Sequence, residues 1–344
     1  MPGTGKARTP APTLEAVAAL AGVSRSTVSR VINGSSQVSP DVVEAVNAAV
    51  IQLRYRPNRA ARSLARRKTM AIALVIPEDT TRFFGDPFFA EIVKGINEGL
   101  ESSEYVLNLQ LAHPSAPSEK TIGYLLGGNV DGAIVVSHHS GDDFFTTLDA
   151  TIPVVFGGRP FRPEIHDTSY VDVDNSAGAA LGVQHLIDIG RRRIATITGP
   201  ADMQAAIDRT DGWVRTMRAA GLPTDLLEHG DFTQASGAQA MRDLLTRAPD
   251  LDAVFVASDL MAVGAVDVLL REYGKRVPED IAVVGFDDSA AALSGAIPLT
   301  TVHQPQRQMG RAMAQMLLER LTAETDPGVQ RLLMDTHLVV RASA

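Results

Sequence analysis

Two kinds of hydrophobic pattern divide the chain near residue 70. Before that point, apolar positions recur every three or four residues, which is the spacing of short amphipathic helices. After it, short β-branched runs alternate with amphipathic segments of helix length. Strand–helix alternation predicts parallel sheets that are covered by helices on both faces. The pattern therefore predicts a small all-α domain followed by a larger α/β domain.

The first region contains the pattern of a helix-turn-helix. A helix over 14–21 has Thr13 as a candidate N-cap and ends at Gly22, and a second helix over 25–32 has Ser24 as its cap. Two short helices joined by a glycine-containing turn form the helix-turn-helix motif, whose second helix enters the DNA major groove. The side chains expected to pack inside this motif are Leu14, Val17, Ala18, Ala21, Val23, Thr27, Val28 and Val31.

A third helix is expected over 41–53, after a Ser39-Pro40 pair that supplies an N-cap and a proline at the first helical position. The side chains that would pack against the first two helices are Val42, Val43, Val46, Ala49, Val50 and Leu53. The basic stretch 56–68 that follows has good helical propensity but almost no apolar face, and short isolated helices are marginal in water. We expect it to become ordered when its charges meet phosphate, although a plain basic linker would share this composition.

The net charge of −8 conceals an uneven distribution along the chain. Residues 1–68 contain eleven Lys or Arg and three Asp or Glu, a net charge of +8, and the other residues have a net charge of −16. A basic end on an acidic body suggests a polyanionic partner for that end alone. A solubilising charged tail would give the same count, and the helical pattern is what favours DNA.

Composition also argues against secretion and membrane insertion. The chain has no cysteine, which excludes a disulfide framework and thiolate metal sites. Residues 1–12 are rich in Pro, Gly and Thr and lack the apolar stretch of a secretion signal. The longest apolar strings are far shorter than the ~20 residues that span a bilayer. We therefore expect a cytoplasmic protein with a disordered amino-terminal tail and no membrane role.

Candidate enzyme and metal motifs fail on spacing or position. The tandem acids at 142–143 and 287–288 place neighbours on opposite sides of a strand or turn, so they make poor acid–base pairs. The histidine pair at 138–139 lacks the spaced partners of a metal site. The glycine-rich run 127–132 precedes a strand, whereas a dinucleotide-binding fingerprint follows one. We expect no enzymatic activity, no cofactor and no metal.

The α/β region repeats its alternation twice, which suggests two lobes with a cleft between them. The expected strands are 71–76, 106–111, 132–137, 153–156, 170–173, 194–198, 253–257 and 281–286, and the expected helices are 88–102, 119–126, 142–149, 176–189, 209–220, 234–246 and 260–273. Ligands of doubly wound sheets bind beyond the carboxyl ends of the strands. The small and polar residues at those ends include Glu78, Asp79, His113, Ser137, His138, Gly157, Gly158, Arg159, Gly199, Ser258, Asp259, Asp287 and Asp288.

Four phenylalanines, at 83, 84, 88 and 89, follow the first expected strand. Sugar sites combine aromatic platforms with planar polar groups, because sugars present both apolar ring faces and radiating hydroxyls. The cluster therefore suggests a sugar platform. Packing of the helix over 88–102 is the alternative, and it is the preferred interpretation for Phe89.

Two motifs in the first region resemble the DNA-binding headpiece of the LacI/GalR family of bacterial repressors: T-V-S-R-V-I-N at 27–33 and Y-R-P-N-R-A-A-R-S-L-A at 55–65. The resemblance implies a recognition helix that reads bases and a hinge helix that begins near Asn58. It also implies that Leu64 enters the minor groove at the centre of a palindromic operator, where an apolar wedge unstacks a base step. The DNA-binding residues implied are Thr13, Ser24, Arg25, Ser26, Thr27, Ser29, Arg30, Asn33, Tyr55, Asn58, Arg59, Arg62 and Leu64.

The rest of the chain resembles the periplasmic-binding-protein-like effector domain of the same family. Its landmarks are H-L-I-D-I-G at 185–190, A-S-D-L-M-A at 257–262, V-V-G-F-D-D at 283–288 and P-L-T-T-V-H-Q-P at 298–305. The resemblance implies that Arg209, Asp287 and Gln304 grip the ligand, and that Phe232 rather than Trp213 stacks on it. With the strand-end and aromatic candidates added, the expected effector-binding residues are Phe83, Phe84, Phe88, Ser137, Arg159, Arg209, Phe232, Ser258, Asp287 and Gln304.

Two positions depart from the family pattern. Gly158 stands where many members have Asp, and Ser258 stands where many have Asn. Each change enlarges the pocket or removes a polar clamp, which puts a simple monosaccharide in doubt. Within the family, the runs at 156–160, 170–175 and 230–233 are most similar to the cellobiose-responsive repressors of high-GC bacteria. That resemblance implies a β-linked glucose disaccharide, while maltose-type and other plant-derived oligosaccharides remain open.

The expected fold is thus an all-α helix-turn-helix headpiece plus an α/β two-lobed effector domain. Its expected parts are a tail at 1–12, a DNA-binding domain at 13–56, a hinge helix at 57–68 and an effector-binding and dimerisation domain at 69–344, with lobe N at about 69–171 and 302–331 and lobe C at about 172–299 and 332–344. We expect a homodimer, since no heptad helix follows the last expected strand, at 337–341, and we expect a small sugar to release it from its operator. A corepressor-type regulator and a sugar-binding protein without a regulatory role are the alternatives.

Overall fold

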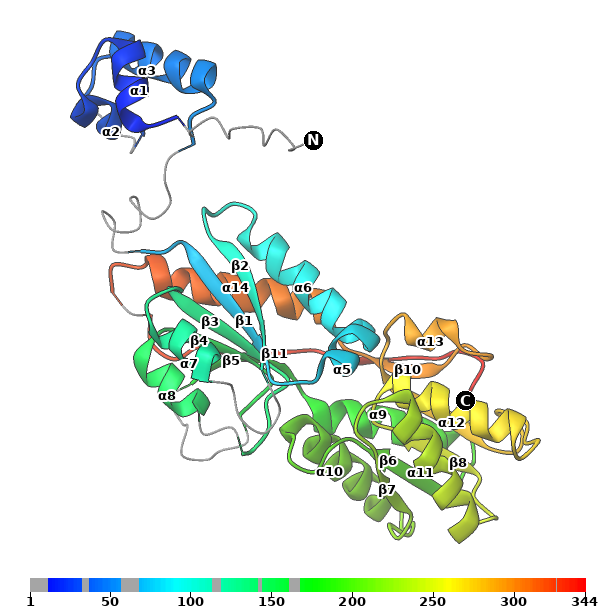
Figure 1. Ribbon diagram of the computed structural model, residues 1–344. Helices are drawn as coiled ribbons and strands as arrows, with labels where there is room; N and C mark the ends of the chain where they lie inside the picture. The colour runs from blue at the N-terminus through cyan, green and yellow to red at the C-terminus, as the bar shows by residue number, and fades with distance from the viewer. Residues whose placement is uncertain are drawn as a thin grey trace, which may run out of the picture. The chain divides into compact units, whose positions relative to one another are not determined.

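A computed structural model describes residues 12–32, 37–56, 68–112, 119–141, 144–160, 168–325 and 327–344. The chain divides into two units, Met1–Thr69 and Met70–Ala344 (Figure 1). The expected hinge helix at 57–68 and the expected tail at 1–12 fall almost wholly outside the described residues.

The smaller unit contains three helices around one core. They are α1 (Leu14–Ala21), α2 (Arg25–Ile32) and α3 (Pro40–Leu53), which confirms the expected pattern. The Thr13 hydroxyl accepts a hydrogen bond from the amide of Ala16, and Gly22 ends α1 in the left-handed conformation. The core side chains are Val17, Ala18, Val28, Val46, Ala49 and Tyr55.

The capping of α2 and α3 differs in one respect from expectation. The Ser24 hydroxyl accepts a hydrogen bond from the Thr27 amide at 3.1 Å, as an N-cap should. Ser39 occupies the N-cap position of α3, but its side chain makes no capping hydrogen bond. Pro40 at the first helical position, whose fixed φ suits a helix start, is therefore the local feature that begins α3.

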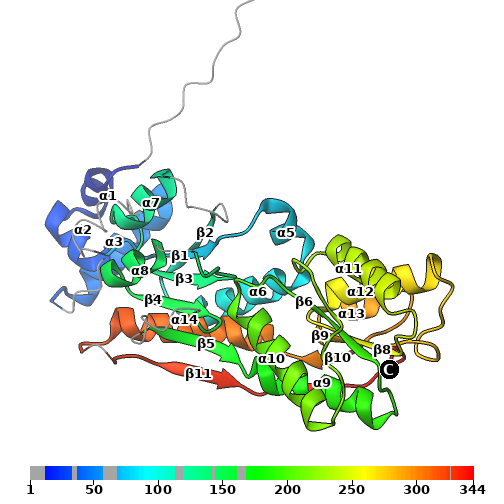
Figure 2. The same cartoon turned by 90° about the horizontal axis from the view of Figure 1, so that it is seen from below.

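The larger unit has two six-stranded sheets that lie end to end (Figures 1 and 2). We call them lobe N and lobe C. Lobe N has the order β11 (Arg331–Met334), β5 (Ser169–Val173), β4 (Val154–Gly157), β3 (Gly132–Val136), β1 (Ala71–Ile76) and β2 (Val106–Leu111), all parallel. Lobe C has the order β12 (His337–Val339), β10 (Thr300–His303), β9 (Ala282–Asp287), β8 (Ala253–Val256), β6 (Ile194–Thr198) and β7 (Leu227–His229), with β12 alone antiparallel.

Helices cover both faces of each sheet. In lobe N these are α5 (Thr80–Gly85), α6 (Pro87–Leu100), α7 (Glu119–Leu126), α8 (Phe144–Thr151) and α14 (Gln306–Thr322), and in lobe C they are α9 (Asn175–Asp188), α10 (Gln204–Ala219), α11 (Gln234–Arg247), α12 (Asp259–Arg271) and α13 (Ala291–Ser294). Strand β1 is buried on both faces: Ile72 and Leu74 pack with α6 and α14, whereas Ala73 and Val75 pack with α7 and α8. This explains why the run at 71–76 is continuously apolar instead of alternating.

The two-lobed α/β architecture confirms the expected fold class, with differences in detail. Helix α10 begins five residues before the expected 209, and β9 extends to Asp287. The expectations omitted α5, α13, the long helix α14 and the short strands β7, β10 and β11. The described chain passes between the lobes after β5, after β10 and between β11 and β12, so lobe motion would bend three connections. None of its helices is long and apolar enough to cross a membrane.

Candidate effector and DNA-binding sites

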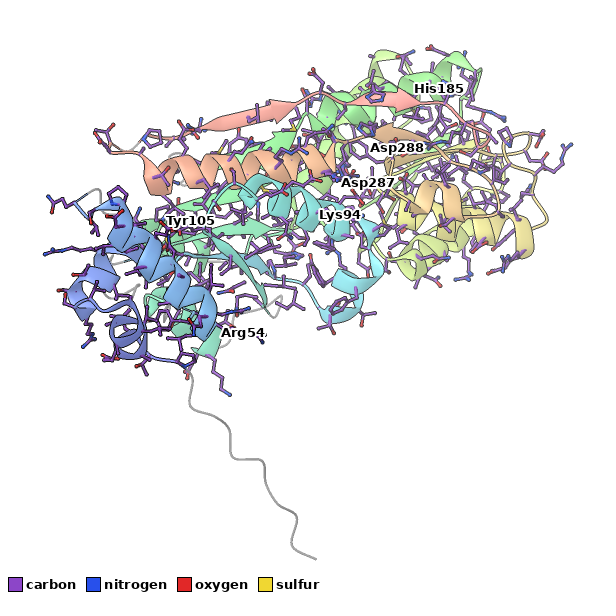
Figure 3. All side chains as sticks on the ribbon, turned by 90° about the horizontal axis from the view of Figure 1, so that it is seen from above. Arg54, Lys94, Tyr105, His185, Asp287 and Asp288 are labelled. Atoms are coloured by element: carbon purple, nitrogen blue, oxygen red, sulfur yellow. The ribbon has the colours of Figure 1, made fainter. Side chains whose placement is uncertain are left out.

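A cavity opens between the lobes at the carboxyl ends of their strands. It encloses about 660 Å³ of space between atoms, part of it open to solvent. Asp287 lies near the middle of the larger unit, at the boundary between the two lobes (Figure 3). The lining residues are Arg82, Asp86, Phe88, Ile92, Val136, Ser137, Gly157, Gly158, Asp172, Asn175, Met203, Ala205, Arg209, Phe232, Ser258, Asp287, Gln304 and Met309.

The structure brings together most, but not all, of the expected effector-binding residues. Those that line the cavity are Phe88, Ser137, Arg209, Phe232, Ser258, Asp287 and Gln304. Phe83 is buried in the core of lobe N, and Phe84 is 77% exposed, so neither lines the cavity. The Arg159 guanidinium pairs with Asp208 at 2.8 Å, on the surface.

Buried Arg209 organises the lobe C side of the cavity. Its Nε donates to Asn175 Oδ1 at 2.9 Å, and one Nη donates to the Ala257 carbonyl at 2.6 Å. The same Nη lies 3.6 Å from Asp287 Oδ1, and the guanidinium carbon lies 3.7 Å from the Phe286 ring centroid. Desolvation lowers the pKa of Arg209, and the nearby carboxylates oppose this effect. Groups of the protein itself thus fix the guanidinium.

Asp287 is held by two glutamines as well as by Arg209. Gln304 Nε2 donates to its Oδ1 at 2.5 Å, and Gln306 Nε2 donates to its carbonyl at 2.6 Å. Burial raises the pKa of Asp287 well above its ordinary value, while Arg209 lowers it. Its φ is +117°, and cavity residues Ser137 and Phe232 have φ values of +65° and +66°. Such backbone strain in non-glycine residues is typical of functional sites.

Four polar residues that the expectations omitted line the same cavity: Arg82, Asp86, Asp172 and Asn175. Asp172 accepts from the Arg159 amide at 2.8 Å and from Asn175 Nδ2 at 3.0 Å, and burial raises its pKa. Asp86 caps α6 by accepting from the Phe88 amide at 3.0 Å, and burial raises its pKa also. A signal did exist for Asp172 and Asn175, since the run at 170–175 contains the expected strand 170–173 and its carboxyl end.

Phe232 and Trp213 have different environments, as the resemblance implied. Trp213 is fully buried in the core of lobe C, whereas Phe232 lines the cavity. The ring of Phe232 lies against Gly199: a Cβ at that position would stand 2.1 Å from the ring Cζ. Only glycine leaves room for the aromatic side chain there.

The two departures from the family pattern have different structural settings. A Cβ on Gly158 would meet only His138 Nε2, at 3.8 Å, so glycine leaves open space beside the cavity. The Ser258 hydroxyl caps α12 by accepting from the Met261 amide at 3.3 Å. Gly158 thus leaves open space at the cavity wall, and its φ of +96° itself favours glycine, whereas Ser258 has a structural task at that wall.

Polar contacts cross from lobe N to lobe C at the rim of the cavity. His139 lies 3.2 Å from Glu78 Oε1 in its own lobe and 3.0 Å from Asp202 Oδ2 in lobe C. The Ser140 amide donates to the Asp202 carbonyl at 2.9 Å. The hydrogen bond to Glu78, followed by that to Asp202, raises the pKa of His139. These contacts hold the lobes together on one side of the cavity.

The expected recognition helix presents polar side chains in the smaller unit. Arg25, Ser26 and Arg30 are exposed on α2, and the Ser24 hydroxyl lies 2.8 Å from those of Ser26 and Thr27. Tyr55 instead packs in the core of the unit. Thr13 caps α1, and Ser29 is half-buried on α2. The other expected DNA-binding residues, Asn33, Asn58, Arg59, Arg62 and Leu64, lie outside the described residues.

Neither unit offers a candidate metal centre: in the parts of the chain that the structure describes, no three His, Cys, Asp or Glu side chains gather as metal ligands would.

A helix-turn-helix headpiece joined to a two-lobed α/β domain with an interlobe cavity defines a DNA-binding regulator controlled by a small molecule. Residues 13–58 match the sequence model of the bacterial regulatory proteins of the lacI family, and residues 183–344 match that of a periplasmic binding protein-like domain. The chain belongs to the lacI family of bacterial transcriptional regulators.

Individual relatives align over nearly the full length. The HTH-type transcriptional regulator CelR of Thermobifida fusca is 50% identical over 335 residues, which cover 96% of this chain and 98% of that protein. The ribose operon repressor of Escherichia coli (strain K12) is 35% identical over 338 residues, covering 96% and 99%. A solved CelR–cellobiose complex is 48% identical with a TM-score of 0.76, covering 97% of this chain and 100% of that one. A lac repressor dimer bound to operator and the anti-inducer ONPF is 29% identical with a TM-score of 0.82, covering 96% and 98%.

Proposed function

We propose that this regulator represses carbohydrate-utilisation genes and that a glucose disaccharide, with cellobiose as the first candidate, releases it from its operator. The observation that carries the proposal is the cavity between the lobes. It combines the aromatic rings of Phe88 and Phe232 with carboxylate, amide and guanidinium groups, the combination that sugar sites use. The 48% identical CelR structure, which was solved with cellobiose, supports the same ligand for this chain.

Charge pairing in the cavity favours a neutral ligand. Arg209 faces Asp287, and Arg82 pairs with Glu78, so neither guanidinium presents an unpaired positive charge. Asp86 and Asp172 add further carboxyl groups to the lining. A phosphorylated or carboxylated sugar would therefore lack a cationic partner and would meet carboxyl groups instead.

The proposed mechanism is a population shift between open and closed lobes. A homodimer in the cytoplasm binds a palindromic operator through α2, where Arg25, Ser26 and Arg30 contact base edges, and through the predicted hinge helices. Sugar bound between the lobes favours their closed arrangement and lowers the affinity for DNA. Only a ligand that binds one arrangement more tightly than the other can have this effect.

The test is an electrophoretic mobility-shift titration of the full-length protein on the DNA upstream of its own gene. We expect cellobiose to raise the dissociation constant for this DNA at least tenfold, and maltose and glucose to have smaller effects. Retardation that no sugar changes would contradict the effector assignment and leave DNA binding intact. Tighter retardation with cellobiose would instead indicate a corepressor.

A further inference from the structure

The short helix α5 carries a buried arginine from lobe N onto lobe C. Asp79 caps this helix by accepting from the Thr81 amide at 2.7 Å and the Arg82 amide at 3.0 Å. The Arg82 side chain is only 9% exposed. Within lobe N, its Nη1 donates to Glu78 Oε1 at 2.5 Å, and its Nη2 lies 3.4 Å from the Ser137 hydroxyl. These contacts fix the guanidinium at the cavity wall.

The same guanidinium touches lobe C. Its two Nη atoms lie 3.9 and 4.0 Å from Met203 Sδ, and its carbon lies 5.1 Å from the centroid of the Phe232 ring. This is within the range of a cation–π contact. Arg82 therefore covers the aromatic ring that is the best candidate for stacking, and it bridges the two lobes from α5.

One hydrogen-bonding group of Arg82 remains unused. Its Nε–H is buried and has no acceptor among the described residues. A buried donor without an acceptor is costly, and natural structures satisfy nearly all such groups. Arg82 lines the cavity, and a ligand oxygen can accept this hydrogen bond once the neighbouring side chains move to expose the Nε–H. The positive charge, by contrast, is already paired with Glu78.

We propose that Arg82 determines effector specificity: its Nε–H donates to an oxygen of a neutral sugar while its guanidinium, held against the Phe232 ring, forms part of the wall that the sugar contacts. The inference rests on the proposed function and adds a specific residue to it. A single side chain would then contact the ligand and both lobes, so ligand binding and lobe closure would depend on the same group. Because a disaccharide is longer than a monosaccharide, we expect it to contact both Arg82 and the pair Arg209 and Asp287 more readily.

The test is isothermal titration of full-length wild type, Arg82→Lys and Arg82→Gln with cellobiose, glucose and glucose 6-phosphate. Lysine keeps the charge beside Glu78 but has neither the Nε–H nor the planar face. We expect Arg82→Lys to bind cellobiose at least tenfold more weakly and to lose most of the preference for cellobiose over glucose. Circular dichroism spectra and urea unfolding midpoints close to those of wild type check that both variants fold.

Arg242→Lys is the matched control, because Arg242 pairs with Glu272 on the surface of lobe C. It should change no sugar affinity. If wild type binds cellobiose and both Arg82 variants keep its affinity and its cellobiose-to-glucose ratio, the role of Arg82 is wrong and the proposed function stands. If wild type binds none of the sugars, the role of Arg82 and the proposed function are both wrong. Tighter binding of glucose 6-phosphate than of cellobiose would overturn the assignment of a neutral ligand.

Discussion

Gly199 sets the position of the aromatic wall of the cavity. The ring atoms Cζ, Cε1 and Cε2 of Phe232 lie 2.1, 2.6 and 2.6 Å from the place that a Cβ on Gly199 would occupy. No side chain can stand there unless the ring moves. The position of Phe232 thus depends on an absent side chain as well as on its own strained backbone.

We predict that Gly199→Ala weakens cellobiose binding about tenfold, roughly 1.4 kcal/mol, because the displaced Phe232 ring no longer faces the ligand. Isothermal titration measures the change, and operator affinity without sugar should be unaffected. Gly141→Ala is the control, since a Cβ there has no neighbour within 4 Å. Unchanged cellobiose affinity in Gly199→Ala would argue against Phe232 as the stacking residue.

Individual residues of the site could be predicted from the sequence where a structural rule fixes the direction in which the side chain points. The carboxyl end of a parallel strand faces the ligand side, and this rule located Ser137, Ser258 and Asp287. No such rule applies to Phe83 and Phe84, because the direction of their side chains depends on how the short helix α5 packs. Arg82 was missed for the same reason: only the fold shows that α5 turns it into the cavity.

At the scale of elements, α6 and α14 approach each other through glycines. A Cβ on Gly95 would stand 2.0 Å from the carbonyl oxygen of Arg307, and one on Gly310 would stand 2.3 Å from that of Ile92. Backbone atoms cannot move aside as the end of a flexible side chain can. The close crossing of the two helices therefore requires glycine at both positions.

We predict that Gly95→Ala lowers the free energy of unfolding of the protein by about 2 kcal/mol, because the added methyl group forces α6 away from α14. Chemical denaturation followed by circular dichroism measures this. Gly123→Ala, in helix α7 with no neighbour within 4 Å of the new Cβ, should be neutral or slightly stabilising. If Gly95→Ala were as stable as wild type, α6 and α14 would be able to accommodate the methyl group without loss of stability, which would contradict the prediction.

Elements with strong periodicity could be predicted, and short edge elements could not. Strands β1 and β6 have the expected bounds because buried, largely apolar runs mark them, and β2 also has the expected bounds although it is only half-buried. Strand β11 has exposed side chains at 331–333, so its sequence carries no burial signal, and its pairing with β5 depends on the fold. Helix α14 did carry a signal, with buried Met309, Met313 and Leu317 at helical spacing.

At the scale of the whole molecule, adjacent histidines at the junction of the lobes have opposite protonation preferences. His138 is fully buried beside the Gly158 carbonyl, and desolvation lowers its pKa to about 4. His139 faces Glu78 and Asp202, and the hydrogen bond to Glu78 is the largest cause of its raised pKa. Arg82 shares the Glu78 carboxylate. Acid therefore favours the contacts of His139, whereas at His138 it places a charge in a desolvated site, which destabilises the folded state.

The direction in which pH changes the free energy of unfolding follows from the linkage between protonation and folding. The folded protein binds the proton of His139 more tightly than the unfolded chain does, so the contribution of His139 to the free energy of unfolding is fully present below about pH 6.5. It disappears as the pH rises through the higher pKa of the folded state. For His138 the folded state binds the proton less tightly, and its contribution is lost as the pH falls from about 6.5 to about 4.

We therefore predict that His139→Gln destabilises the protein more at pH 6 than at pH 8.5, relative to wild type at each pH. His138→Gln is the internal comparison: the stability deficit of this variant relative to wild type should shrink as the pH falls from 6.5 towards 4. Urea denaturation of the three proteins across this range measures both differences. An equal effect of His139→Gln at pH 6 and pH 8.5 would mean that a neutral imidazole makes the contact with Asp202. The interlobe contact would then be a pH-independent hydrogen bond and not an ion pair.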